Sequence, residues 1–72
     1  MAKQITVLGT GYVGLVSSVG LADFGNSVIG VDLRSDIVET LNSGRPTIYE
    51  IGIDSYLERN LEAGRLRFND RL

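Results

Sequence analysis

The chain has 72 residues, of which 43% are hydrophobic and 22% are charged, and its formal net charge is −2. This apolar content is typical of a globular chain rather than a disordered one, and the length allows a single small domain. Because the chain has no cysteine and no histidine, we expect no disulfide framework and no metal site. The acidic balance offers no basic surface, so we expect no nucleic-acid or membrane partner. No apolar run is long enough for a signal peptide or a membrane span, which favours a cytoplasmic location.

The first half of the chain predicts a strand, a helix and a second strand. Residues 5–8 form a compact, partly β-branched run that ends at a glycine, which is typical of a short buried strand. A helix should follow and end at Gly25 and Asn26, because apolar or small residues recur at intervals of three and four: Val13, Val16, Gly20 and Phe24, with Leu15 and Val19 beside them. Residues 28–31 form a second apolar run. Since neither strand alternates cleanly, both suit a parallel sheet covered on both faces.

The second half predicts two helices and a third strand. Asp36 should begin the first of these helices, with Glu39 completing a capping pair, and Gly44 should end it. Residues 45–52 contain the single proline and should form a loop. The next helix should span about residues 53–63, with an apolar face made by Ile53, Tyr56, Leu57 and Leu61. Residues 66–68 alternate as in a short edge strand.

Strands that alternate with helices predict right-handed crossovers, and therefore an α/β fold with a parallel sheet. We expect about three strands in the order 3-2-1, with flanking helices. The first strand would then be an open edge, and exposed apolar edges template further association. We therefore expect the chain to be marginally stable alone, or to pair with another copy.

A glycine motif, Gly9-Thr10-Gly11-Tyr12-Val13-Gly14, stands between the first predicted strand and the first predicted helix. In this context G-x-G-x-x-G is typical of a dinucleotide-binding turn. Gly9 would allow the tight reversal, Gly11 the close approach of a pyrophosphate, and Gly14 the close packing of the helix on the sheet. The backbone N–H groups of Gly11, Tyr12 and Val13 would point at the phosphates from the positive end of the helix.

Asp32 ends the second predicted strand, eighteen residues after Gly14, where an acidic residue would accept hydrogen bonds from the adenosine ribose. Its charge would repel a 2′-phosphate, so the motif favours NAD over NADP. Arg34 complicates this choice because a nearby arginine can accommodate a 2′-phosphate, although a solvated arginine lying over the adenine is the simpler interpretation. The other interpretation of the whole motif is a glycine-rich turn that binds no ligand.

The remaining polar residues carry less information. Thr10 could contact a phosphate or serve only as a turn residue, and Tyr12 could shield the pyrophosphate or only cover the start of the helix. Tyr49 and Tyr56 are expected to be packing residues. Four carboxylates are interpreted as a solvated acidic helix face and its lead-in: Glu50, Asp54, Glu58 and Glu62.

Residues 5–16 resemble the opening of the UDP-glucose 6-dehydrogenase family and its nucleotide-sugar dehydrogenase relatives. The resemblance continues through residues 22–25, Val31-Asp32, Ile48-Tyr49-Glu50 and residues 60–68, so it covers nearly the whole chain. It implies the N-terminal portion of a Rossmann NAD-binding domain, here residues 1–72, with NAD held by Gly9, Gly11, Tyr12, Val13, Gly14, Asp32 and Arg34. Two departures are Ile51, where the family usually has proline, and Asn69, where it usually has threonine.

Members of this family oxidise the C6 alcohol of a UDP-sugar with two NAD+ and a cysteine nucleophile. This chain has no cysteine, so the resemblance implies that no residue here is catalytic. The UDP-sugar would bind through a further domain, and the parent enzyme is expected to be a homo-oligomer. Two other interpretations stay open at this point: a segment of another NAD-dependent dehydrogenase, for example one for 3-hydroxyacyl or 6-phosphogluconate substrates, and a non-catalytic nucleotide-binding module.

Overall fold

Three parallel strands form one sheet in the computed structural model, which describes residues 2–48 and 50–71. The strands are β1 (Gln4–Leu8), β2 (Ser27–Val31) and β3 (Leu66–Asn69), in the order β1-β2-β3. Helix α1 (Tyr12–Asp23) connects β1 to β2, and α2 (Ser35–Asn42) and α3 (Ile53–Glu62) lie between β2 and β3. These observations confirm the predicted α/β fold, the parallel sheet and the strand order 3-2-1.

The register brings the carboxyl ends of β1 and β2 together. Leu8 pairs with Val31, and the pairing continues one residue beyond β1, where the Gly9 N–H donates to the Val31 carbonyl at 2.7 Å. On the other side of β2, the Asp32 N–H donates to the Asn69 carbonyl at 3.0 Å. The segment after β1 and the segment after β2 therefore start side by side at one edge of the sheet.

The core lies between the sheet and the helices. Fully buried apolar side chains come from every layer: Leu15 and Ala22 of α1, Leu41 of α2, Leu57 of α3, Val28 of β2, and Leu66 and Phe68 of β3. The Phe68 ring packs directly on Gly30, where an added Cβ would lie 2.6 Å from a ring carbon. This close contact requires glycine at the centre of β2.

Helix α1 forms where it was predicted, but the repeat that predicted it does not face the core. Val13 is 73% exposed and Phe24, just after the helix, is 90% exposed, whereas the core side of α1 consists of Leu15, Ser18, Val19 and Ala22. The helix is apolar on both sides, so spacing alone could not select the side that β2 covers.

The start of α2 and the buried face of α3 also differ from the prediction. Helix α2 begins at Ser35, its N-cap is Arg34, and no side chain caps it, so the predicted pair of Asp36 and Glu39 is wrong. Asp36 lies in the first turn, where its charge still favours the positive end of the helix. In α3, Tyr56 is 43% exposed, and the buried position one turn later belongs to Asn60.

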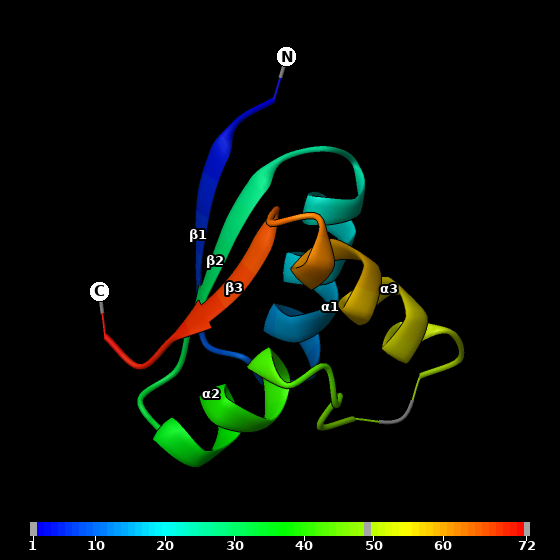
Figure 1. Ribbon diagram of the computed structural model, residues 1–72. Helices are drawn as coiled ribbons and strands as arrows, with labels where there is room; N and C mark the ends of the chain where they lie inside the picture. The colour runs from blue at the N-terminus through cyan, green and yellow to red at the C-terminus, as the bar shows by residue number, and fades with distance from the viewer. Residues whose placement is uncertain (1, 49, 72) are drawn as a thin grey trace.

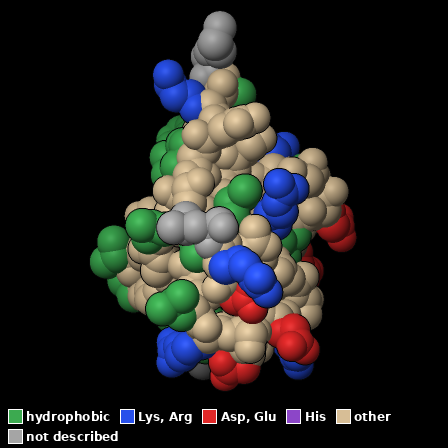
Figure 2. Space-filling model, turned by 90° about the vertical axis from the view of Figure 1, so that its left-hand side faces the viewer, with side chains coloured by type: hydrophobic (Ala, Val, Ile, Leu, Met, Phe, Trp, Pro, Cys, Tyr) green, Lys and Arg blue, Asp and Glu red, His purple; other side chains and the backbone are tan. Residues whose placement is uncertain are grey.

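The helices cover one face of the sheet, which corrects the expectation that both faces are covered (Figure 1). A shallow hollow lies on the other face, and its lining includes the polar side chains Gln4, Thr6, Ser27 and Arg67. Figure 2 looks from that side, where green apolar side chains are interspersed with tan and blue ones.

Tyr49, expected to be a packing residue, lies outside the described residues. In the described ranges no helix is both long and apolar enough to cross a membrane.

Candidate dinucleotide-binding site

The three motif glycines occupy three different backbone environments. Gly9 has a φ of +93°, a left-handed conformation that glycine adopts without strain. Gly11 is the extended N-cap of α1, and an added Cβ there would meet no atom within 4 Å. Gly14 is the crowded position, because an added Cβ would overlap the carbonyl oxygen of Gly9 and lie 2.9 Å from its carbon. The turn thus packs tightly on its inner side and is open above Gly11.

The N-terminus of α1 faces this opening with its polar backbone groups available. Within the described part of the chain, no hydrogen bond uses the N–H groups of Gly11, Tyr12 or Val13. No side chain caps the helix, and its first turn contains no acidic residue. The side chains of Tyr12 and Val13 are more than half exposed and lie outside the core. Unpaired N–H groups at the positive end of a twelve-residue helix form a surface that suits phosphate.

Asp32 lies directly beside the glycine turn. Its Oδ2 accepts hydrogen bonds from the Thr10 hydroxyl at 2.8 Å and from the Thr10 N–H at 3.1 Å. Its Oδ1 accepts a hydrogen bond from the Arg34 N–H at 3.0 Å. These three hydrogen bonds hold the carboxylate firmly. The Asp32 side chain is still 15% exposed, so a ligand can reach it.

These hydrogen bonds also favour the charged form of Asp32. The Arg34 backbone N–H and the Thr10 hydroxyl lower the pKa of the Asp32 carboxyl below its ordinary value, although partial burial opposes them. The Thr10 N–H and the charge of Arg34 lower this pKa further. Asp32 is therefore an anion at neutral pH.

Arg34 is 70% exposed, and its Nε lies 3.7 Å from Asp32 Oδ1. Beside this ion pair an open hollow of about 500 Å³ is lined by Leu8, Gly9, Val31, Asp32, Leu33 and Arg71. Leu8 and Leu33, which are 68% and 88% exposed, form an apolar part of this lining next to the carboxylate. Neither Leu33 nor Arg71 was predicted to belong to the site. The position of Leu33 immediately after the acidic residue was the available signal.

A second contact joins the turn to the loop before α3. The Tyr12 hydroxyl donates to Glu50 Oε2 at 3.0 Å, and this contact raises the pKa of Tyr12. Neither of the two predicted roles for Tyr12 included this partner. Ile51, one of the two departures from the resemblance, lies in this loop and is fully exposed.

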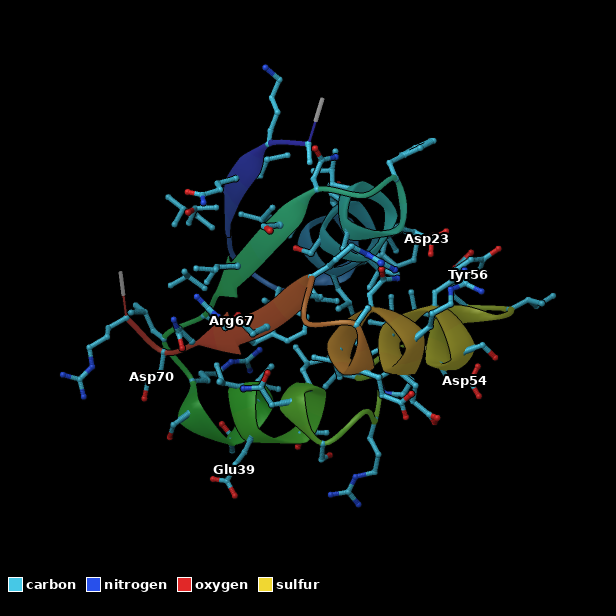
Figure 3. All side chains as sticks on the ribbon, turned by 45° about the horizontal axis from the view of Figure 1, so that its top comes forward. Asp23, Glu39, Asp54, Tyr56, Arg67 and Asp70 are labelled. Carbon is cyan, nitrogen blue, oxygen red and sulfur yellow. The ribbon has the colours of Figure 1, made fainter. Side chains whose placement is uncertain are left out.

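Apart from Asp32 and Glu50, no acidic residue of the described ranges forms a hydrogen bond or ion pair with the side chains of the turn. Glu39 and Asp54 project outward from α2 and α3 (Figure 3), and in the described ranges no group of carboxylates could hold a metal ion. Asp23, at the end of α1, and Tyr56 of α3 line the same hollow and are labelled next to each other in Figure 3. Its Oδ1 accepts hydrogen bonds from Arg59 at 2.8 Å and from Asn60 at 3.1 Å. This network links two helices and is structural.

A glycine turn, an open helix N-terminus and an acidic residue at the end of the neighbouring parallel strand together define the opening of a Rossmann dinucleotide-binding fold. The family model described as "UDP-glucose/GDP-mannose dehydrogenase family, NAD binding domain" matches residues 3–72. The chain therefore belongs to the UDP-glucose/GDP-mannose dehydrogenase family, within its NAD-binding domain.

Individual relatives agree with this assignment. The UDP-glucose 6-dehydrogenase of Rhizobium meliloti (strain 1021) is 45% identical over 96% of this chain, which covers 16% of that relative. Among solved structures, a UDP-glucose dehydrogenase from Pyrobaculum islandicum superposes with a TM-score of 0.88 at 48% identity, over 99% of this chain and 16% of its own. A UDP-D-ManNAc dehydrogenase from Pyrococcus horikoshii gives a TM-score of 0.91 at 41% identity, over 94% of this chain and 16% of its own. The chain thus spans about one sixth of the length of these relatives.

Proposed function

We propose that this chain binds the adenosine and pyrophosphate portions of NAD. The Asp32 carboxylate would accept a hydrogen bond from the adenosine ribose, and the N–H groups of Gly11, Tyr12 and Val13 would hold the pyrophosphate above the open side of Gly11. Gly9 and Gly14 would shape the turn, and Arg34 would lie near the adenosine. The observation that carries this proposal is the contact of Asp32 with Thr10. This contact holds an anionic carboxylate next to backbone N–H groups that are free to donate to a phosphate.

The same geometry favours NAD over NADP. A 2′-phosphate would have to approach a carboxylate that is ionised and only 15% exposed. Arg34 could offset this repulsion only in part, because its side chain is 70% exposed and already lies near Asp32. Like charges at such short range are strongly unfavourable when they are partly desolvated.

Calorimetric titration of the chain with NAD+ and with NADP+ tests the proposal. We expect heat from NAD+ and little from NADP+. Asp32→Ala should weaken NAD+ binding about tenfold or more, since hydrogen bonds to charged groups are the strong ones. Asp36→Ala is the matched control, because it removes an equal charge from an exposed residue nearby in the first turn of α2. If Asp36→Ala weakens binding as much as Asp32→Ala does, the ribose does not contact Asp32.

We further propose that the chain serves a nucleotide-sugar dehydrogenase that oxidises UDP-glucose to UDP-glucuronate with two NAD+. Relatives at 45% and 48% identity carry UDP-glucose in their names, whereas a GDP-mannose 6-dehydrogenase from Pseudomonas syringae pv. tomato is 38% identical. Bound NAD+ would supply the hydride acceptor, and this chain's residues would only bind and orient its adenosine half. The sugar nucleotide and the catalytic groups would belong to residues outside these 72.

Mixing the chain with UDP-glucose and NAD+ and recording absorbance at 340 nm tests this division of labour. We expect no NADH, although NAD+ binds, because the chain has no cysteine to act as nucleophile. NADH formation by the chain alone would show that the catalytic groups lie within it. In the longer enzyme, UDP-glucose should give a higher kcat/KM than GDP-mannose. Binding without turnover in that enzyme would instead favour a non-catalytic nucleotide-binding module.

A further inference from the structure

Thr10 stands between Gly9 and Gly11 in the turn, yet it is almost completely buried, with an exposed fraction of 3%. Both of its donors reach one atom, since its hydroxyl and its N–H donate to Asp32 Oδ2. A residue needed only to reverse the chain would not have to contact a side chain 22 positions away. These contacts also direct the Thr10 hydroxyl to the Asp32 carboxylate, a partner that neither of its two predicted roles included.

Thr10 leaves part of the hydrogen-bonding capacity of the Asp32 carboxylate available. An ionised carboxylate offers about four lone-pair positions. Thr10 takes two of them on Oδ2, and the Arg34 N–H takes one on Oδ1. The fourth position, on Oδ1, is used by no hydrogen bond in the described residues, although the Arg34 Nε lies 3.7 Å from this oxygen. Because the side chain is 15% exposed, a ligand hydroxyl can still reach the carboxylate.

We propose that Thr10 is a positioning residue that fixes the Asp32 carboxylate with one open acceptor site, on Oδ1, toward the nucleotide ribose. The choice of ribose as the donor rests on the proposed function. The hydrogen bonds from Thr10 stop the carboxylate from rotating and favour its charged form. A carboxylate that is already oriented loses less conformational freedom when the ligand binds, which strengthens binding.

Three variants separate this role from simple support of the turn. Thr10→Val keeps the shape and the N–H but removes the hydroxyl, whereas Thr10→Ser keeps both donors. Ser18→Ala is the matched control, because Ser18 is fully buried in the same helix-turn unit and its hydroxyl donates to the Gly14 carbonyl at 2.8 Å without reaching Asp32. A purely structural role predicts that Thr10→Val and Ser18→Ala lower the melting temperature but leave the Asp32 titration unchanged.

The first measurement is an NMR titration of the Asp32 carboxyl carbon without nucleotide. We expect similar pKa values for the wild type, Thr10→Ser and Ser18→Ala, and a higher pKa for Thr10→Val. In the wild type, the Thr10 amide proton should shift with the same midpoint as the Asp32 carboxyl, so the contact can be tested even if Thr10→Val does not fold. A Thr10 amide shift that does not follow the Asp32 titration overturns the proposal, as does an unchanged pKa in folded Thr10→Val.

The second measurement is NAD+ calorimetry on the same variants. Thr10→Val should bind about fivefold more weakly, as expected for the loss of one hydrogen bond, and Thr10→Ser should restore binding. Equal affinity of the wild type and folded Thr10→Val overturns the positioning role. If the wild type gives no heat, the proposed function fails, and so does the choice of the ribose as the donor to Asp32. The NMR titration then still decides whether Thr10 orients Asp32.

Discussion

The substitution Gly14→Ala tests whether the inner side of the glycine turn is as crowded as the structure shows. The new Cβ would overlap the Gly9 carbonyl oxygen and lie 2.9 Å from the carbonyl carbon. Both atoms belong to the backbone, so no side chain can rotate away to make room. Gly9 cannot yield easily either, because its φ of +93° and its N–H bond to Val31 fix it at the end of β1.

Gly20→Ala is the matched control on the same helix. An added Cβ at Gly20 meets no atom within 4 Å, so alanine should stabilise the chain by about 1 kcal/mol through its helix propensity. Gly14→Ala gains at most the same amount, but overpacking opposes it by roughly 1–3 kcal/mol, and contact with rigid backbone favours the upper end of that range. The two variants should therefore differ in free energy of unfolding by about 2–3 kcal/mol.

Urea denaturation followed by circular dichroism measures this difference. With an m-value of about 1 kcal/mol/M for a protein of this size, the midpoints should lie about 2–3 M apart. NAD+ binding should be impaired in Gly14→Ala and unchanged in Gly20→Ala, since only the first variant moves the turn. If both variants unfold within about 0.5 kcal/mol of each other, the close packing of α1 on the turn is wrong.

Three further predictions concern the fold. Leu57→Ala should lower the free energy of unfolding by about 2–5 kcal/mol, because Leu57 is fully buried, and a loss below about 1 kcal/mol in urea denaturation would contradict its place in the core. Asn42→Ala should cost about 1–2 kcal/mol and speed hydrogen exchange of the Phe68 amide, since the Asn42 amide group donates to Phe68 O at 2.8 Å and accepts from Phe68 N at 2.9 Å. Asn69→Ala is the control, and unchanged exchange at Phe68 in Asn42→Ala would show that the contact is absent. Hydrogen bonds from Arg59 and Asn60 lower the pKa of Asp23 below its ordinary 3.8, so this stabilisation is complete above pH 3.8 and disappears as the pH falls through the lower folded value. Asp23→Asn should remove that part of the acid destabilisation in melting curves between about pH 2 and 6, and identical pH profiles would refute it.

The secondary structure was largely predictable because glycines mark where the helices end. Gly25, Gly44 and Gly64 follow the three helices with φ values of 104°, 87° and 77°. Such residues end a helix by local geometry alone, so a short window of sequence is sufficient to find them. The glycine motif and Asp32 were found for a similar reason, since their spacing reflects one strand-helix-strand unit.

Features that depend on contacts between distant segments were not predictable. Thr10 and Asn60 are buried polar residues whose partners, Asp32 and Asp23, lie 22 and 37 positions away. Nothing in their local sequence distinguishes them from exposed polar residues. The start of α2 was misplaced because Ser35, Asp36 and Glu39 are compatible with more than one cap position, and the structure uses none of their side chains as a cap.

The contact between Asn69 and Asp32 uses the backbone of β3 and not the Asn69 side chain. Asp32 is held at two points, because its N–H donates to the Asn69 carbonyl and its side chain accepts from Thr10. The first contact uses only a backbone carbonyl, which asparagine supplies as well as threonine does. A shift of one residue in the pairing of β2 with β3 would move the Asn69 carbonyl away from the Asp32 N–H and turn the side chains of β3 to the opposite face of the sheet. The core contact of Phe68 with Gly30 opposes such a shift, so the backbone contact that holds Asp32 depends on packing on the helix side of the sheet.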